Sequence, residues 1–205
     1  MKTLSSPLAS TICSVKSAVC VLSIVAAVVS AQAQNYGLTN RNSTLQVNVA
    51  SGPGIATDFR VDGVNHLYQH WFYYRVGSVG GEFPIQNIDP TPLINSYQNL
   101  SAFARLDVTY ANTDYSVTTL YQLTGQTAGT GRANLNETIT VQNTSLSPLE
   151  FHLFQYSDFD LGGTAGGQMV QYFLNDVTGQ YYRVTQSGAG VSVTETINSP
   201  APPIG

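Results

Sequence analysis

Along most of the chain, apolar and polar residues alternate, which is the period expected of strands that bury one face. Residues 43–50 show the pattern clearly, because Leu45, Val47 and Val49 fall on one face and polar residues fall between them. The alternation recurs in segments rich in β-branched and aromatic residues, separated by Gly, Pro, Asn and Asp. The predicted strands are 43–50, 55–61, 64–76, 82–88, 102–110, 115–124, 135–142, 149–159, 168–174, 180–186 and 191–197.

Short polar turns join several of these strands. Asp62-Gly63 is a hairpin signal, residues 111–114 separate two long strands, and residues 176–179 separate another pair. About ten or eleven short strands with regular turn signals favour an all-β fold, and specifically an antiparallel two-sheet β-sandwich. A closed β-barrel is the alternative architecture.

The first 33 residues have the composition of an export signal. Lys2 and Lys16 supply positive charge, residues 18–29 are apolar, and Ala31-Gln32-Ala33 is a small-residue cleavage site. Cleavage near Ala33–Gln34 is expected, and an uncleaved anchor is the alternative. The apolar run of about 12 residues is shorter than the ~20 that a membrane-spanning helix needs, so no integral membrane span is expected in the mature chain. The predicted organisation is a signal peptide (1–33), a lead-in (34–42), the β-sandwich domain (43–197) and a Pro-rich tail (198–205).

Charge and cysteine content narrow the choice of partners. Both cysteines and both lysines fall within residues 1–33, which leaves six arginines against twelve acidic residues, a net charge of −6 with histidine neutral. An acidic, lysine-free surface repels phosphate, so nucleic acid is not an expected partner. Without disulfides, the mature domain depends on hydrophobic burial, at roughly 25 cal/mol per Å² of apolar area.

The strand at 64–76 is the candidate ligand-binding element. Trp71 and Tyr73 fall on one face, and Tyr68, Phe72 and Tyr74 fall on the other. One face must be core, and the other can present flat rings for stacking against sugar rings. Trp71 and Tyr73 are therefore candidate binding residues, Tyr68 is added to them as a third candidate, and a strand buried on both faces is the alternative. His66 and His70 are not predicted to share a metal ion, because four strand residues span roughly 13 Å.

Asp158 and Asp160 form the most concentrated polar group, and Leu161 and two glycines follow them. On a continued strand, residues two apart point the same way, and carboxylates with loop carbonyls are typical calcium ligands. Calcium is the only cofactor that the sequence suggests. Capping of a turn by the two aspartates is the alternative. A pair of facing carboxylates would also suit glycoside hydrolysis. The nucleophile motif G-x-S-x-G and the phosphate-binding P-loop are both absent from the sequence.

Three stretches carry a family resemblance, namely residues 57–67, 71–77 and 151–161. They resemble exported proteins of environmental bacteria that are sorted by an exosortase, the PEP-CTERM class. The printed sequence ends at Gly205 without the Val-Pro-Glu-Pro sorting segment of that class. Either the sorting segment is missing, or this protein is released. The resemblance implies an extracellular β-protein and supplies no catalytic residues.

Together these features predict a secreted or cell-surface bacterial protein that is non-enzymatic and associated with extracellular matrix or envelope. Polysaccharide or other envelope components are the expected partners. The first alternative is a carbohydrate-binding module that uses the aromatic residues of the strand at 64–76. The second alternative is a glycan-active hydrolase that uses Asp158 and Asp160.

Overall fold

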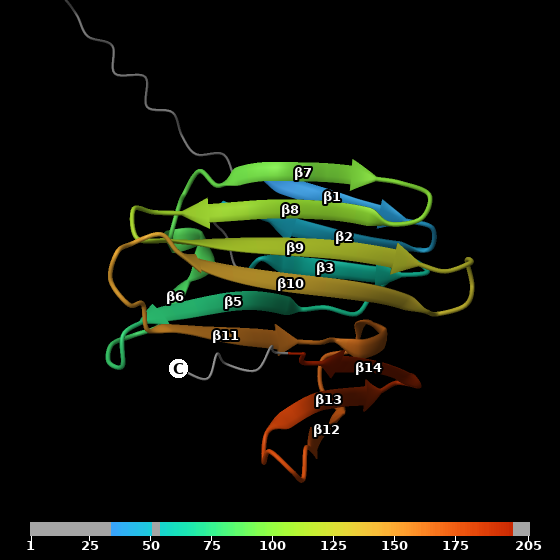
Figure 1. Ribbon diagram of the computed structural model, residues 1–205. Coiled ribbons are helices and arrows are strands. Elements are labelled where there is room, and N and C mark those ends of the chain that lie inside the picture. The colour runs from blue at the N-terminus through green and yellow to red at the C-terminus, as the bar shows by residue number, and fades with distance from the viewer. Residues whose placement is uncertain (1–33, 51–53, 199–205) are drawn as a thin grey trace, which may run out of the picture. The chain divides into compact units, whose positions relative to one another are not determined.

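The computed structural model describes residues 34–50 and 54–198, which form fourteen strands and two short 3-10 turns (Figure 1). The prediction of an all-β, antiparallel sandwich is confirmed. The predicted signal peptide and residues 199–205 of the predicted tail lie outside the described residues, so those predictions remain untested.

The largest sheet has seven strands, in the order β1-β2-β3-β5-β11, with β4 beside β3 and β6 beside β5. Its strands are β1 (Asn35–Asn40), β2 (Ser43–Asn48), β3 (Ala56–Val61), β4 (Val64–Asn65), β5 (Gln69–Val76), β6 (Phe83–Pro84) and β11 (Phe151–Asp158). Residues 34–42, described from the sequence as a lead-in, contain β1, which pairs with β2 along its whole length. The turn η1 (Ile85–Asn87) follows β6.

A four-stranded sheet in the order β10-β9-β8-β7 faces the first (Figure 1). Its strands are β7 (Leu93–Asn99), β8 (Ala104–Ala111), β9 (Tyr115–Gly125) and β10 (Ala133–Asn143). Alternate residues of β9 are buried throughout its length, which fits the predicted period of two. The core draws on both sheets, with Leu38, Leu45, Val47, Ala56 and Phe72 from the first and Ala104, Leu106, Val108, Tyr110, Val117, Tyr121 and Leu123 from the second.

The C-terminal strands form a small third sheet, in the order β12-β13-β14. Its strands are β12 (Met169–Leu174), β13 (Tyr181–Gly188) and β14 (Val191–Thr196), and the turn η2 (Leu161–Gly163) precedes them. The predicted hairpin around residues 176–179 joins β12 and β13. Polar contacts tie this sheet to β11, since the Glu195 carboxylate accepts hydrogen bonds from Ser157 and Gln155 at 2.9 Å each.

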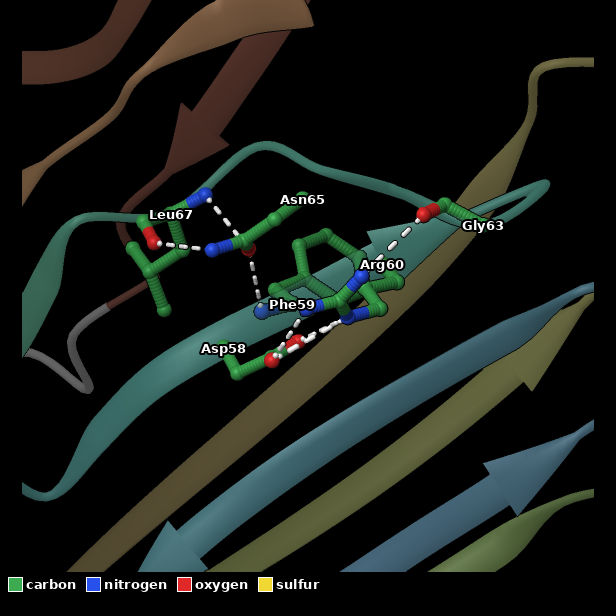
Figure 2. A network of polar contacts seen from close by, with 6 residues as sticks. All are labelled: Asp58, Phe59, Arg60, Gly63, Asn65 and Leu67. Atoms are coloured by element: carbon green, nitrogen blue, oxygen red, sulfur yellow. Dashed lines mark hydrogen bonds and ion pairs between the residues drawn. The ribbon is translucent and has the colours of Figure 1, made fainter. Parts of the chain in front are cut away.

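The hairpin between β3 and β4 fixes the connection that leads into β5 (Figure 2). Asp62 and Gly63 both have positive φ, at 50° and 84°, as the predicted tight turn requires. The Asn65 side chain accepts hydrogen bonds from the backbone N–H groups of Phe59 (3.0 Å) and Leu67 (3.2 Å) and donates to the Leu67 carbonyl (3.1 Å). This one amide therefore ties β3 to the segment immediately before Tyr68.

Candidate ligand-binding face

One side of the β5–β11 strand pair carries a row of aromatic residues. Phe72 and His70 are buried on one side of β5, so the alternating residues Trp71 and Tyr73 lie on its other side. In the register, Trp71 lies opposite Tyr156 and Tyr73 lies opposite Phe154, which places all four on the same side. We call this group, together with Tyr68, the aromatic face: Tyr68, Trp71, Tyr73, Phe154 and Tyr156.

Asp158 and Tyr68 lie together at one end of the aromatic face. The Tyr68 N–H donates to the backbone carbonyl of Asp158 at 2.9 Å. Tyr156 precedes Asp158 by two residues, so both side chains lie on the same side of β11, and the Tyr156 hydroxyl donates to Asp158 Oδ2 at 3.4 Å. The negative charge of Asp158 raises the pKa of Tyr156 most, with smaller effects from slight desolvation, this hydrogen bond, Tyr68 and Tyr73. The Tyr156 hydroxyl therefore lies within electrostatic range of Asp158, Tyr68 and Tyr73.

The rings differ in how much they meet solvent. Tyr68 is 62% exposed and Tyr156 is 47% exposed, whereas Trp71 is half-buried and packs against the core. The Trp71 indole N–H donates to Gln86 Oε1 at 2.9 Å, and the Gln86 amide donates to the Asn48 carbonyl at 3.2 Å. The Trp71 ring lies 5.2 Å from that of Tyr73. Trp71 is therefore a fixed support, and the more accessible rings are those of Tyr68 and Tyr156.

The structure changes two details of the sequence prediction. Tyr68 does not share the core side with Phe72, because β5 begins at Gln69 and Tyr68 lies before the strand. Tyr156 was not among the predicted binding residues, although it lies directly opposite Trp71. The signal for Tyr156 was present in the apolar and aromatic run at 149–159, but only the strand register connects it to Trp71.

The far end of the aromatic face is charged. The Arg75 guanidinium lies 5.5 Å from the centre of the Phe154 ring, and its Nε donates to the Gly77 carbonyl at 3.3 Å. His152, opposite Arg75 in the register, contacts Glu150 with 3.0 Å between Nε2 and Oε1. The face thus runs from a carboxylate at Asp158 to a guanidinium at Arg75.

Asp160 is separated from this row by the end of the strand. β11 ends at Asp158, and Asp160 begins the turn η2, so strand alternation no longer places the two carboxylates on one side. Across residues 34–50 and 54–198, no group of three or more His, Cys, Asp or Glu side chains has the arrangement of a metal site. Calcium binding by Asp158 and Asp160 stays a prediction, and the chemistry of this region rests on Asp158.

A second polar cluster lies on the opposite side of the same strand pair. His70 Nδ1 lies 2.9 Å from Ser157 Oγ, and His70 Nε2 lies 3.0 Å from Glu137 Oε1 on β10. Because the Ser157 hydroxyl donates a hydrogen bond to the Glu195 carboxylate, it accepts a hydrogen bond from His70 Nδ1–H. With the other ring nitrogen facing Glu137, this arrangement favours the imidazolium form. Such a ring cannot take a proton from Ser157, so the pair lacks the arrangement of a serine nucleophile and its base.

His66, the other histidine of the predicted pair, has separate partners. Its Nδ1 accepts a hydrogen bond from the Gly162 N–H at 3.1 Å, and desolvation by burial lowers its pKa. It therefore helps to attach the turn η2 to the β4–β5 connection. His70 is instead engaged by Ser157 and Glu137, so the structure gives the two rings different roles.

The geometry thus defines a sandwich-like all-β protein with one aromatic sheet face. Comparison with protein-family models, with curated proteins and with solved structures gives no match for this chain. Within the described residues, the structure contains no helix with the length and hydrophobicity to cross a membrane.

Proposed function

We propose that this chain is a non-catalytic, extracellular carbohydrate-binding protein of a bacterial matrix or envelope. The observation that carries the proposal is the aromatic face, where accessible rings of Tyr68 and Tyr156 flank the half-buried rings of Trp71 and Tyr73. Flat rings on a rigid sheet suit sugar rings, whose C–H groups pack on aromatic surfaces while their hydroxyls reach polar groups at the edge. Asp158, Gln69 and Arg75 supply such groups on the same side of the strand pair.

The support of Trp71 strengthens the proposal. A binding surface gains affinity when its side chains are already ordered before the ligand arrives. The hydrogen bond to Gln86 fixes the Trp71 ring, and the register places Tyr156 opposite Trp71. Location outside the cell is supported by the predicted export signal at 1–33, and N-terminal sequencing of secreted material beginning at Gln34 would test it.

Binding to a panel of immobilised neutral and charged polysaccharides tests the function. We expect retention on at least one polysaccharide, and we expect Tyr156→Ala or Tyr68→Ala to weaken it about two- to tenfold, since contacts of aromatic rings are worth roughly 0.5–1.5 kcal/mol. Tyr172→Ala is the matched control, because Tyr172 has the same 62% exposure as Tyr68 but lies on the third sheet. No retention on any polysaccharide, or equal losses in Tyr68→Ala and Tyr172→Ala, would contradict the proposal.

A further inference from the structure

We propose, building on the function above, that the aromatic face selects glycans with free amino groups, and that Asp158 receives the ammonium group beside Tyr68 and Tyr156. The ligand class is a polymer or oligomer of amino sugars that is not fully acetylated.

The first support is that the Asp158 carboxylate has no cationic partner among the described residues. In the part of the chain that the structure describes, no cationic side chain pairs with it, and its side-chain contact is the long 3.4 Å one from the Tyr156 hydroxyl. Other described carboxylates do have cationic partners, as Asp58 has Arg60 and Asp107 has Arg105. Asp158 is thus a negative charge on a ligand-facing surface with capacity for a charged hydrogen bond.

The second support is the surrounding aromatic rings. An ammonium group is attracted both to a carboxylate and to the faces of tyrosine rings, and aromatic cages with acidic groups are a general means of binding organic cations. Tyr156 is adjacent to Asp158 on the face, and Tyr68 is attached to the Asp158 backbone by its own N–H. A neutral sugar would use the rings and leave the carboxylate charge without a function.

The third support is the distribution of charge along the face. The nearest arginine in the row, Arg75, lies six positions along β5 from Gln69, the residue opposite Asp158, which is about 20 Å at ~3.3 Å per residue. It also stacks on Phe154. An acidic sugar at the Tyr156 end would meet Asp158 without a compensating cation. The net charge of −6 after residue 33 favours a cationic polymer over an anionic one.

Titration calorimetry with short glucosamine oligomers and the matching N-acetylglucosamine oligomers tests the inference on the full chain. We expect the free-amine oligomer to bind about tenfold more tightly at a pH where its amines are protonated. Asp158→Asn keeps the shape and removes the charge, so it should abolish this preference, and the free-amine oligomer should then bind no more tightly than the acetylated one. Asp176→Asn removes the same charge from the exposed β12–β13 turn and should leave the preference intact.

The outcomes separate this inference from the function on which it rests. Equal binding of both oligomers, or a preference that survives in Asp158→Asn, overturns the inference and leaves glycan binding standing. Absence of binding to every glycan removes both.

Should Asp158→Asn fold poorly, the unsubstituted chain gives a second readout, because raising salt must erase the preference for the free amine while leaving binding of the acetylated oligomer almost unchanged. A preference insensitive to salt contradicts the role of charge. If added calcium raises the melting temperature of the unsubstituted chain, and this rise is lost in Asp158→Asn, the carboxylate binds the metal instead.

Discussion

His70 Nε2 lies 3.0 Å from Glu137 Oε1, and this contact joins β5 of the seven-stranded sheet to β10 of the facing sheet. The two side chains are only 5% and 17% exposed. Neither atom has a well-aligned hydrogen bond, so the contact acts mainly through charge. On its other side the ring meets Ser157, which donates to Glu195 of the third sheet. One histidine therefore links all three sheets.

This pair predicts a stability that falls as the pH rises. Burial is the largest single effect on the His70 ring and lowers its pKa, but the attraction of Glu137 and Glu195 together outweighs it, so the pKa is raised. A raised pKa means that the stabilisation is complete below the unfolded value of about 6.5 and is lost as the pH rises through the folded value. We expect the free energy of unfolding, measured with urea, to decrease over this window.

The variant His70→Gln isolates the effect of this ring. It should unfold with a pH dependence that lacks the His70 contribution, and it should cost about 3 kcal/mol at pH values below 6.5, since it leaves a nearly buried carboxylate without its cation. His66 acts in the opposite direction because its pKa is lowered, and it remains in both proteins. An unchanged slope after substitution would show that His70 is neutral in the folded state.

A second prediction concerns the contact between Gly125 of β9 and Asn40 of β1, which lie on the two large sheets. The Gly125 N–H at the end of β9 donates to Asn40 Oδ1 of β1 at 2.9 Å, and a Cβ on Gly125 would collide with the Asn40 carbonyl oxygen. Because the obstacle is backbone, Gly125→Ala should destabilise the fold by about 2–3 kcal/mol, as overpacking does elsewhere. Gly81→Ala is the control, since nothing lies within 4 Å of its added methyl group. Equal melting temperatures for the two variants would refute this.

A third prediction concerns Asp62, whose carboxylate holds the β9–β10 loop. It accepts the N–H groups of Gly129 and Gly131, each at 2.7 Å, and these two hydrogen bonds lower its pKa. A lowered pKa means that the contribution is present above the unfolded value of about 3.9 and is lost as the pH falls through the folded value. We expect Asp62→Asn, which tolerates the positive φ of this position, to accelerate amide exchange at Gly129 or Gly131.

Hydrogen exchange followed by NMR measures this directly. The same glycine amides should exchange faster in the unsubstituted protein as acid protonates Asp62, after correction for the intrinsic exchange rate. Asp176→Asn serves as the control for loss of charge alone. Protection of Gly129 and Gly131 that is identical in both variants would show that the loop is held by other contacts.

The parts of the fold that could be predicted are those in which local sequence decides the outcome. Residues 115–124 alternate except at Thr119 and Leu120, and β9 occupies almost the same range. Asp62-Gly63 predicted its turn because few residues adopt positive φ at both positions. In contrast, residues 93–99 lie outside the predicted strands but form β7, which pairs with β8 through an irregular register between Ile94 and Ser96. Pairing with a long, well-formed neighbour overrides weak local preference.

In the candidate site, too, features set by local sequence could be predicted, and features set by contacts with distant strands could not. Alternation along 64–76 placed Trp71 and Tyr73 on one side, and the structure agrees. The partnership with Tyr156 depends on which strand lies beside β5, and roughly 80 residues separate the two strands. The ion pair of His70 with Glu137 depends on how two sheets face one another. Neither relationship has a local signal, so a single sequence could not reveal it.

The last prediction concerns β1 and β7, the edge strands of the two large sheets. Side chains of β7 satisfy the backbone of β1, since Tyr97 Oη and Asn99 Nδ2 donate to the Gly37 carbonyl at 2.8 and 3.1 Å, and the Thr39 N–H donates to Asn99 Oδ1 at 2.9 Å. Unpaired edges are templates for association with another chain. The double variant Tyr97→Phe with Asn99→Ala should therefore lose about 1 kcal/mol per hydrogen bond and self-associate.

Sedimentation velocity at increasing protein concentration checks this expectation. The control is Asn95→Ala on the same strand, because the Asn95 amide donates to Asp107 and Thr109 within its own sheet and leaves β1 covered. The double variant should form larger species as concentration rises, while Asn95→Ala should behave as the unsubstituted chain does. If the double variant sediments like Asn95→Ala, the side chains of β7 do not protect this edge, and the twist of the strands themselves must prevent pairing.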